Sequence, residues 1–67
     1  MSEFGKELAN LRSGQNLTIR DICGRVSIPQ SRLSELERGV RIPTDGQVQR
    51  IEAFFGLDPG KLAALVD

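Results

Sequence analysis

The 67-residue sequence has no histidine, tryptophan or tyrosine, and it has a single cysteine. One cysteine cannot form an intramolecular disulfide, and without histidine it offers too few ligands for a structural zinc site. The sequence also lacks a run of about 20 apolar residues, the length that a membrane-spanning helix needs. Its N-terminus lacks the basic and apolar regions of a signal peptide. We therefore expect a cytoplasmic protein with no membrane span, no metal and no cofactor.

The charges balance, with nine lysines and arginines against nine aspartates and glutamates. A neutral chain argues mildly against a nucleic-acid binder, but the charges are unevenly placed. Residues 25–41 hold four arginines against two glutamates, whereas residues 42–67 hold two basic side chains against four acidic ones. Attraction to phosphate would therefore be local and modest.

A chain this short, without disulfide or metal, has to be stabilised by an apolar core, and a helical bundle is the natural solution. The sequence shows no strand pattern, and its helix signals predict one domain of five short helices over residues 1–67. These helices are expected between Ser2 and Gly14, from Thr18 to about Val26, from Pro29 to Arg38, between Thr44 and Gly56, and from Pro59 to about Val66.

Several local features support these bounds. Thr18 with Asp21, and Thr44 with Gln47, have the spacing of capping boxes at helix N-termini. Gly5 is an inefficient helix residue, which suggests close packing at this position. The lone Cys23 is interpreted as a small core residue, because no histidine is present to activate it.

The helix expected from Pro29 to Arg38 has two different faces. Leu33 and Leu36 form a narrow apolar stripe. The remaining arc is polar and consists of Gln30, Ser31, Ser34, Glu35 and Arg38. Glutamine and serine near a helix N-terminus can contact base edges in the major groove of DNA. Considered alone, however, such a helix is more often an ordinary solvated surface helix.

Residues 17–39 together resemble the lambda-repressor-like helix-turn-helix family, also called the Cro/C1 or Xre type. The resemblance runs without a gap and is carried by Leu17-Thr18, Ile22-Cys23, Val26, Leu33-Ser34 and Leu36-Glu37-Arg38-Gly39, and beyond them by Leu11-Arg12, Pro43, Ile51, Phe55-Gly56-Leu57 and Leu62. It implies an all-α, five-helix lambda-repressor-like domain with its helix-turn-helix over residues 18–38. The helix over residues 29–38 is then expected to lie in the major groove.

The resemblance also implies which residues contact DNA. The base-reading positions fall on Gln30, Ser31 and Glu35, with Ser34 and Arg32 alongside. Gln30 suits adenine, whereas Glu35 either accepts from a cytosine amino group or excludes wrong sites by repulsion.

Phosphate contacts are expected from the N–H groups that follow Thr18 and Thr44 and from the side chains of Arg38 and Arg41. A structural ion pair is implied between Arg12 and Glu37, joining the first and third helices.

Four residues depart from the family pattern. Ile19 stands where many members carry a phosphate-contacting glutamine, and Ser27 replaces the usual turn glycine. In the fourth helix, Asp45 stands at a usually apolar position and Glu52 at a usually small one. These two residues suggest an altered surface on that helix, at a partner interface.

The leading hypothesis is a transcriptional repressor that binds a palindromic double-stranded DNA operator as a homodimer. Candidate residues for the dimer contact are Ala63, Ala64, Val66 and Phe54. The alternative is an interaction module, such as an antitoxin that holds a toxin, and neutral charge together with Ile19 and Glu35 favours it. We do not expect an enzyme, because histidine is absent, the carboxylates are scattered and no glycine-rich phosphate loop is present.

Overall fold

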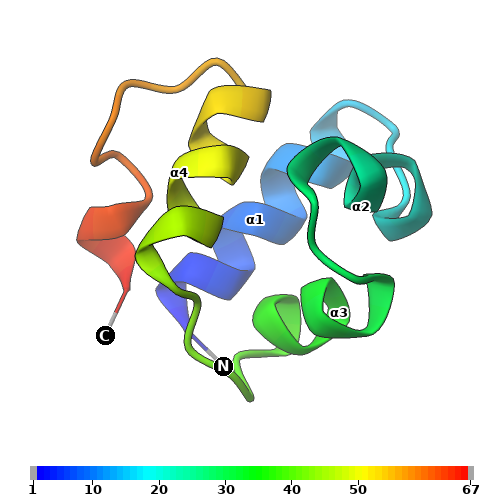
Figure 1. Ribbon diagram of the computed structural model, residues 1–67, viewed down its shortest axis with the longest axis horizontal. Coiled ribbons are helices and arrows are strands. Elements are labelled where there is room, and N and C mark those ends of the chain that lie inside the picture. The colour runs from blue at the N-terminus through cyan, green and yellow to red at the C-terminus, as the bar shows by residue number, and fades with distance from the viewer. Residues whose placement is uncertain (1, 67) are drawn as a thin grey trace.

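The computed structural model describes residues 2–66, so Met1 and Asp67 lie outside the described residues. It contains four α-helices and a short 3-10 helix: α1 (Glu3–Gly14), α2 (Ile19–Val26), α3 (Gln30–Arg38), α4 (Asp45–Phe54) and η1 (Ala63–Leu65). The described residues form no strand, in agreement with the all-α prediction. Helix α1 lies at the centre, with α2 and α4 on either side of the upper half and α3 below (Figure 1).

Both predicted capping boxes are confirmed. The Thr18 hydroxyl accepts from the Asp21 N–H at 3.1 Å, and the Asp21 carboxylate accepts from the Thr18 N–H at 2.7 Å. Thr44 and Gln47 make the same exchange at 3.1 and 2.9 Å. These reciprocal bonds satisfy N–H groups that a helix leaves free at its first turn, and so they set where α2 and α4 begin.

The expected start of the third helix at Pro29 is wrong by one residue. Pro29 has a φ of −56° but a ψ of 146°, which is extended, so α3 begins at Gln30. In this conformation the Pro29 carbonyl still accepts from the Leu33 N–H at 2.9 Å. Pro29 therefore acts as the N-cap of α3 rather than as its first helical residue.

The predicted fifth helix over residues 59–66 is also wrong, because turns replace most of it. Gly60 has a φ of +93°, a left-handed conformation that interrupts a right-handed helix. After it only Ala63–Leu65 is regular, as the 3-10 helix η1. The segment nevertheless packs on the core, since Leu62 is 1 % exposed.

The core lies where the four helices and the C-terminal segment meet. Its buried apolar residues are Phe4, Leu8, Ile22, Val26, Ile28, Leu33, Leu36, Val48, Ile51 and Leu62. Cys23 is half-buried and packs against this core without being one of its buried residues, so its interpretation as a core residue is only partly confirmed.

Gly5 marks the closest approach of two helices. A Cβ atom at this position would lie 2.6 Å from the carbonyl oxygens of both Leu36 and Glu37. Only glycine therefore allows α1 to lie this close to the C-terminal end of α3, which explains an otherwise unfavourable helix residue.

Candidate nucleic-acid interface

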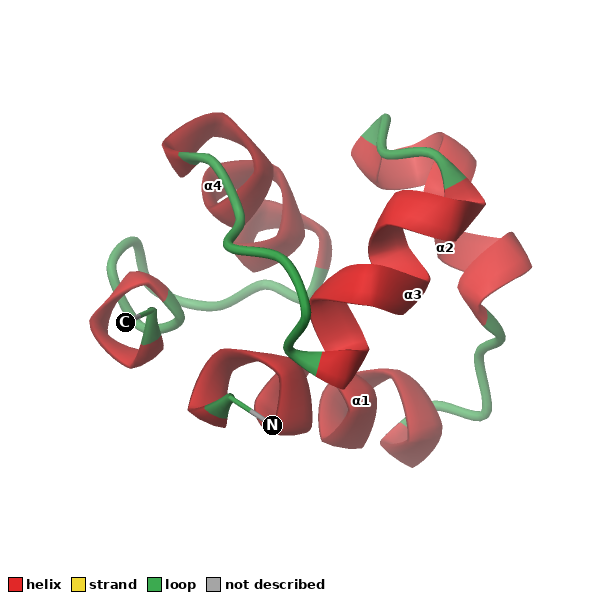
Figure 2. Cartoon of the chain, turned by 90° about the horizontal axis from the view of Figure 1, so that it is seen from below, coloured by secondary structure: helices red, strands yellow, loops and turns green. Residues whose placement is uncertain are grey.

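Helix α3 and the loop that follows it occupy one face of the protein, seen from the front in Figure 2. Leu33 and Leu36 are fully buried and hold α3 on the core. The opposite side is accessible: Gln30, Ser31 and Arg38 are exposed, and Ser34 and Glu35 are partly exposed. The structure thus brings the predicted polar arc together on an open surface.

An ion pair between Arg12 on α1 and Glu37 on α3 holds α3 against α1. The Arg12 Nε and Nη2 groups donate to the two Glu37 carboxylate oxygens at 2.6 and 2.9 Å. The Arg12 Nη1 group donates to the Leu17 carbonyl at 2.8 Å, so one side chain joins α1, the loop before α2 and α3. The hydrogen bonds to Glu37 raise the pKa of Arg12 above its ordinary value.

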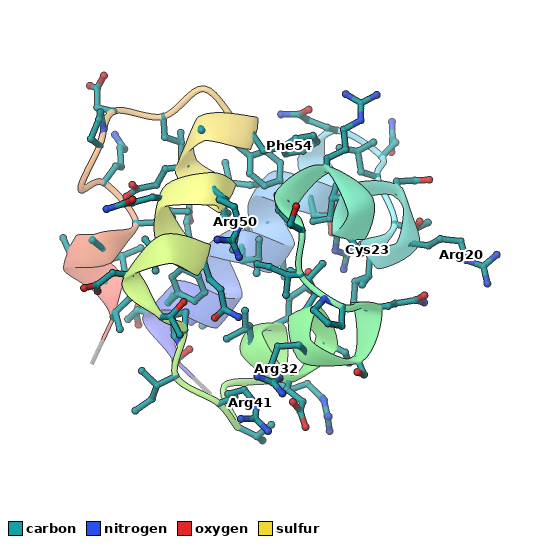
Figure 3. All side chains as sticks on the ribbon, in the orientation of Figure 1. Arg20, Cys23, Arg32, Arg41, Arg50 and Phe54 are labelled. Carbon is teal, nitrogen blue, oxygen red and sulfur yellow. The ribbon has the colours of Figure 1, made fainter. Side chains whose placement is uncertain are left out.

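Arg50 makes a second long-range contact, between α4 and the end of α2, that the sequence did not predict. Its Nε donates to the Val26 carbonyl at 2.7 Å, across 24 residues of sequence. Figure 3 shows Arg50 on α4 pointing towards the chain between α2 and α3. A charged donor at a helix C-terminus satisfies a free carbonyl and suits the helix dipole. No local pattern around Arg50 signals this contact, because its partner is a backbone atom.

Ser27 supplies the turn between α2 and α3. It adopts the left-handed conformation, with φ 55° and ψ 43°, that the usual glycine would adopt more easily. For a non-glycine residue this costs roughly 1–2 kcal/mol. Ile19, at the start of α2, is half-buried against the core and presents no polar group towards Gln30.

Glu35 lies between two arginines on the accessible face. Its Oε1 accepts from the Arg41 Nε at 2.8 Å and lies 3.4 Å from the Arg32 Nε. In Figure 3 the labelled Arg32 and Arg41 side chains lie together beside α3. The Arg41 hydrogen bond, with the charges of Arg41, Arg32 and Arg38, lowers the pKa of Glu35. The carboxylate therefore stays ionised on a surface whose net charge is positive.

The N-termini of α2 and α4 carry the predicted threonine caps, but each also carries an acid. The Thr18 N–H and hydroxyl bonds lower the pKa of Asp21 at the start of α2. Asp45 is exposed in the first turn of α4. A helix leaves the N–H groups of its first turn without an intrahelical partner, and Asp21 and Asp45 both belong to that first turn.

The interpretation of Glu52 as an altered surface residue is wrong. Glu52 is 3 % exposed, and its Oε2 accepts from the N–H groups of Gly60, Leu62 and Ala63 at 3.0, 2.8 and 3.1 Å. Burial raises the pKa of this carboxyl, but the three N–H donors lower it by more, so the pKa lies below its ordinary value. Glu52 fastens the C-terminal segment to α4.

Two large apolar side chains are exposed in the loop after α3. Val40 and Ile42 are 65 % and 69 % exposed, and they flank Arg41.

Among residues 2–66, no three metal-ligating side chains of the His, Cys, Asp or Glu type lie together. No helix within the same residues is long and apolar enough to cross a membrane.

A sequence model described as a helix-turn-helix domain matches residues 3–65 of the chain. The chain belongs to the helix-turn-helix domain family. This confirms the helix-turn-helix family that the resemblance in the sequence implies. In the structure α2 and α3 are consecutive helices joined by the turn at Ser27.

Three relatives of this helix-turn-helix chain are uncharacterised HTH-type transcriptional regulators, one of Mycobacterium bovis and two of Mycobacterium tuberculosis strains. Each is 32 % identical over 62 residues, which is 92 % of the chain and 24 % of the relative. The chain therefore spans about a quarter of the length of these relatives.

Two solved structures share the fold. The master regulator for biofilm formation SinR, in complex with DNA, matches with a TM-score of 0.80 at 16 % identity, over 90 % of this chain and 97 % of that one. The N-terminal DNA-binding domain of SinR from Bacillus subtilis matches with a TM-score of 0.81 at 16 % identity, over 90 % and 88 % of the two chains.

Proposed function

We propose that residues 1–67 form the DNA-binding domain of a transcriptional regulator that reads double-stranded DNA with α3 in the major groove. The observation that carries this proposal is the open polar face of α3, bordered by Arg32, Arg38 and Arg41. The relatives named as HTH-type transcriptional regulators, and the likeness to a SinR structure solved with DNA, support it.

Each polar side chain on this face has a role in the proposal. Gln30 makes a bidentate contact to adenine, and Ser31 contacts the next base edge. Ser34 and Glu35 lie one turn further along α3, and Arg32 lies at the flank of the site. Thr18 and Thr44 place helix N–H groups towards phosphates, where Arg38 and Arg41 add positive charge.

We further propose that the protein is a cytoplasmic repressor that acts as a homodimer on a palindromic operator. One short reading helix gives too few contacts for tight specific binding, and two copies on half-sites one helical turn apart double them. Ala63 and Ala64 are exposed, as a dimer contact requires. Val66 and Phe54 are partly buried against the core, so they can contribute only their outer surfaces.

Selection from a randomised duplex pool, at low and then moderate salt, tests this proposal. Enrichment of an inverted repeat supports a dimeric sequence reader and gives its operator. Enrichment of a single half-site supports reading by a monomer. Binding that is lost as salt rises, without enrichment, reflects phosphate attraction alone and contradicts sequence-specific readout.

An interaction module, such as an antitoxin that binds a toxin, is a second candidate. Exposed Val40 and Ile42 favour it, because large apolar side chains on a surface often mark protein contacts. Co-expression with the product of the adjacent gene, followed by co-purification, distinguishes this candidate from a regulator that acts alone.

A further inference from the structure

Glu35 fixes the loop after α3 in two ways. Its backbone carbonyl accepts from the N–H of Val40, two residues past the end of the helix, at 3.1 Å. Its side chain accepts from the Arg41 Nε at 2.8 Å. Gly39, left-handed with φ 75°, reverses the chain so that Arg41 returns beside α3. A single residue therefore sets both the path of the loop and the position of its arginine.

Arg32 approaches the same oxygen from the helix side. It precedes Glu35 by three residues, a spacing that places both side chains on one side of α3. The Arg32 Nε and the Arg41 Nε both lie nearest to Oε1 of Glu35, at 3.4 and 2.8 Å. The two guanidinium groups are thus gathered around one carboxylate, although one comes from α3 and the other from the loop.

These contacts leave donors unused. A guanidinium has five N–H donors, and its terminal amino groups form the fork that matches phosphate oxygens or a guanine edge. The Arg41 hydrogen bond uses Nε, and the closest approach of Arg32 also uses Nε. The side chains of Arg32 and Arg41 are 41 % and 44 % exposed, so their remaining donors can reach a ligand.

We propose that Glu35 is a positioning residue that holds Arg32 and Arg41 ready to contact DNA, with Arg41 directed at a backbone phosphate. This role rests on the proposed function. A long flexible side chain loses rotamer freedom when it binds, and the carboxylate removes part of that freedom before DNA arrives. Glu35 therefore strengthens binding through its arginines, although its own charge repels phosphate.

A simple repulsive role would have the opposite sign. If Glu35 acted only through its negative charge, removing that charge would tighten binding to every duplex. If it positions Arg41, removing it weakens operator binding and also diminishes the effect of mutating Arg41. A double-mutant cycle separates the two roles, because it measures the coupling between the two side chains.

The experiment compares wild type, Glu35→Gln, Arg41→Gln and the double variant on the selected operator and on a scrambled duplex. We expect Arg41→Gln to weaken operator binding about tenfold in wild type, and less than about threefold beside Glu35→Gln. Glu35→Gln alone should weaken operator binding several-fold. Asp58→Asn, which removes an exposed carboxylate outside this face, is the charge-matched control and should not weaken it.

Two further results decide what a failure means. Thermal unfolding of all variants should stay close to wild type, because exposed ion pairs contribute little to stability. Tighter binding of Glu35→Gln to both duplexes, with an unchanged effect of Arg41→Gln, would overturn the positioning role while leaving DNA readout intact. A wild-type protein without operator preference would overturn the proposed function, and the positioning role with it.

Discussion

Arg12 and Glu37 form a bidentate ion pair, 2.6 and 2.9 Å between donors and acceptors, that joins α1 to the last turn of α3. Their side chains are only 20 % and 10 % exposed. The pair therefore lies between α1 and α3 and is largely shielded from solvent. It positions α3 without using any group that would contact DNA.

Removing one partner of this pair should destabilise the fold. We expect Glu37→Gln to lower the free energy of unfolding by about 3 kcal/mol, because it leaves the Arg12 guanidinium partly buried without a counter-charge. Replacing both residues by methionine should cost less than Glu37→Gln alone, since no unpaired charge then remains. Urea denaturation measures both. Equal losses for the single and double variants would contradict this account.

Two glycine-to-alanine substitutions should have opposite effects. Gly5→Ala puts a methyl group 2.6 Å from two backbone oxygens of α3, so the helices have to separate, at a cost of about 1–3 kcal/mol. Gly24→Ala, in the middle of α2, meets nothing within 4 Å and should stabilise by roughly 0.5–1 kcal/mol. Thermal unfolding measures both signs. Stabilisation by both substitutions would contradict the close approach at Gly5.

Glu52 should make the stability depend on acid pH. Its pKa is lowered in the folded state by three N–H donors, so the unfolded chain binds a proton more readily. The stabilisation is therefore complete above the pKa of about 4.3 for an unfolded glutamate, and it is lost as pH falls through the lower folded pKa.

Melting curves between pH 7 and pH 3 test this dependence with Glu52→Gln, whose amide oxygen still accepts hydrogen bonds but does not titrate. We expect the variant to be less stable than wild type at pH 7 and to lose less stability on acidification. A difference in melting temperature that stays constant over this range would show that Glu52 does not contribute by titration.

Local features of the sequence were enough to predict most of the helical framework. Thr18 and Thr44 mark two helix starts, because a capping box is complete within four residues. The same reasoning failed at Gly60, whose left-handed conformation is stabilised by a carboxylate eight residues earlier. From the sequence, Glu52 is interpreted as part of an altered surface on the fourth helix. It is buried because the C-terminal segment packs over it, and the sequence does not show the path of that segment.

The sequence predicted which residues form the exposed face of the candidate site, but it did not predict the contacts that hold those residues in place. The 3.6-residue period of an α-helix places Gln30, Ser31 and Ser34 on one side of the helix, whatever the rest of the chain does. The pairing of Arg41 with Glu35 depends on how the loop reverses after Gly39, and the tie from Arg50 to the Val26 carbonyl depends on tertiary packing. Neither contact has a signature in the order of the residues.

Gln30 and Ser31 should carry sequence preference without contributing to folding, because both are exposed on α3. We expect Gln30→Ala to weaken operator binding by about 1–3 kcal/mol and to relax preference at one base pair. Ser31→Ala should have a smaller effect in the same direction. Repeating the duplex selection with each variant measures preference. The matched control is Asn10→Ala, an exposed amide on α1, and unchanged preference in Gln30→Ala would disprove the base-reading role.

Arg41 should act on every sequence, because a phosphate contact carries no base information. We expect Arg41→Ala to weaken binding to operator and scrambled duplexes alike, and to lower the slope of log affinity against log salt by about one. Lys61→Ala is the matched control, since Lys61 is exposed in the C-terminal segment, outside the proposed DNA-binding face, and should leave the slope unchanged. Titrations at several salt concentrations measure both slopes. An equal change in the salt slope of the two variants would mean that Arg41 adds only to the overall charge. A contact with a defined phosphate depends on the position of the side chain, so it should be lost in one variant and kept in the other.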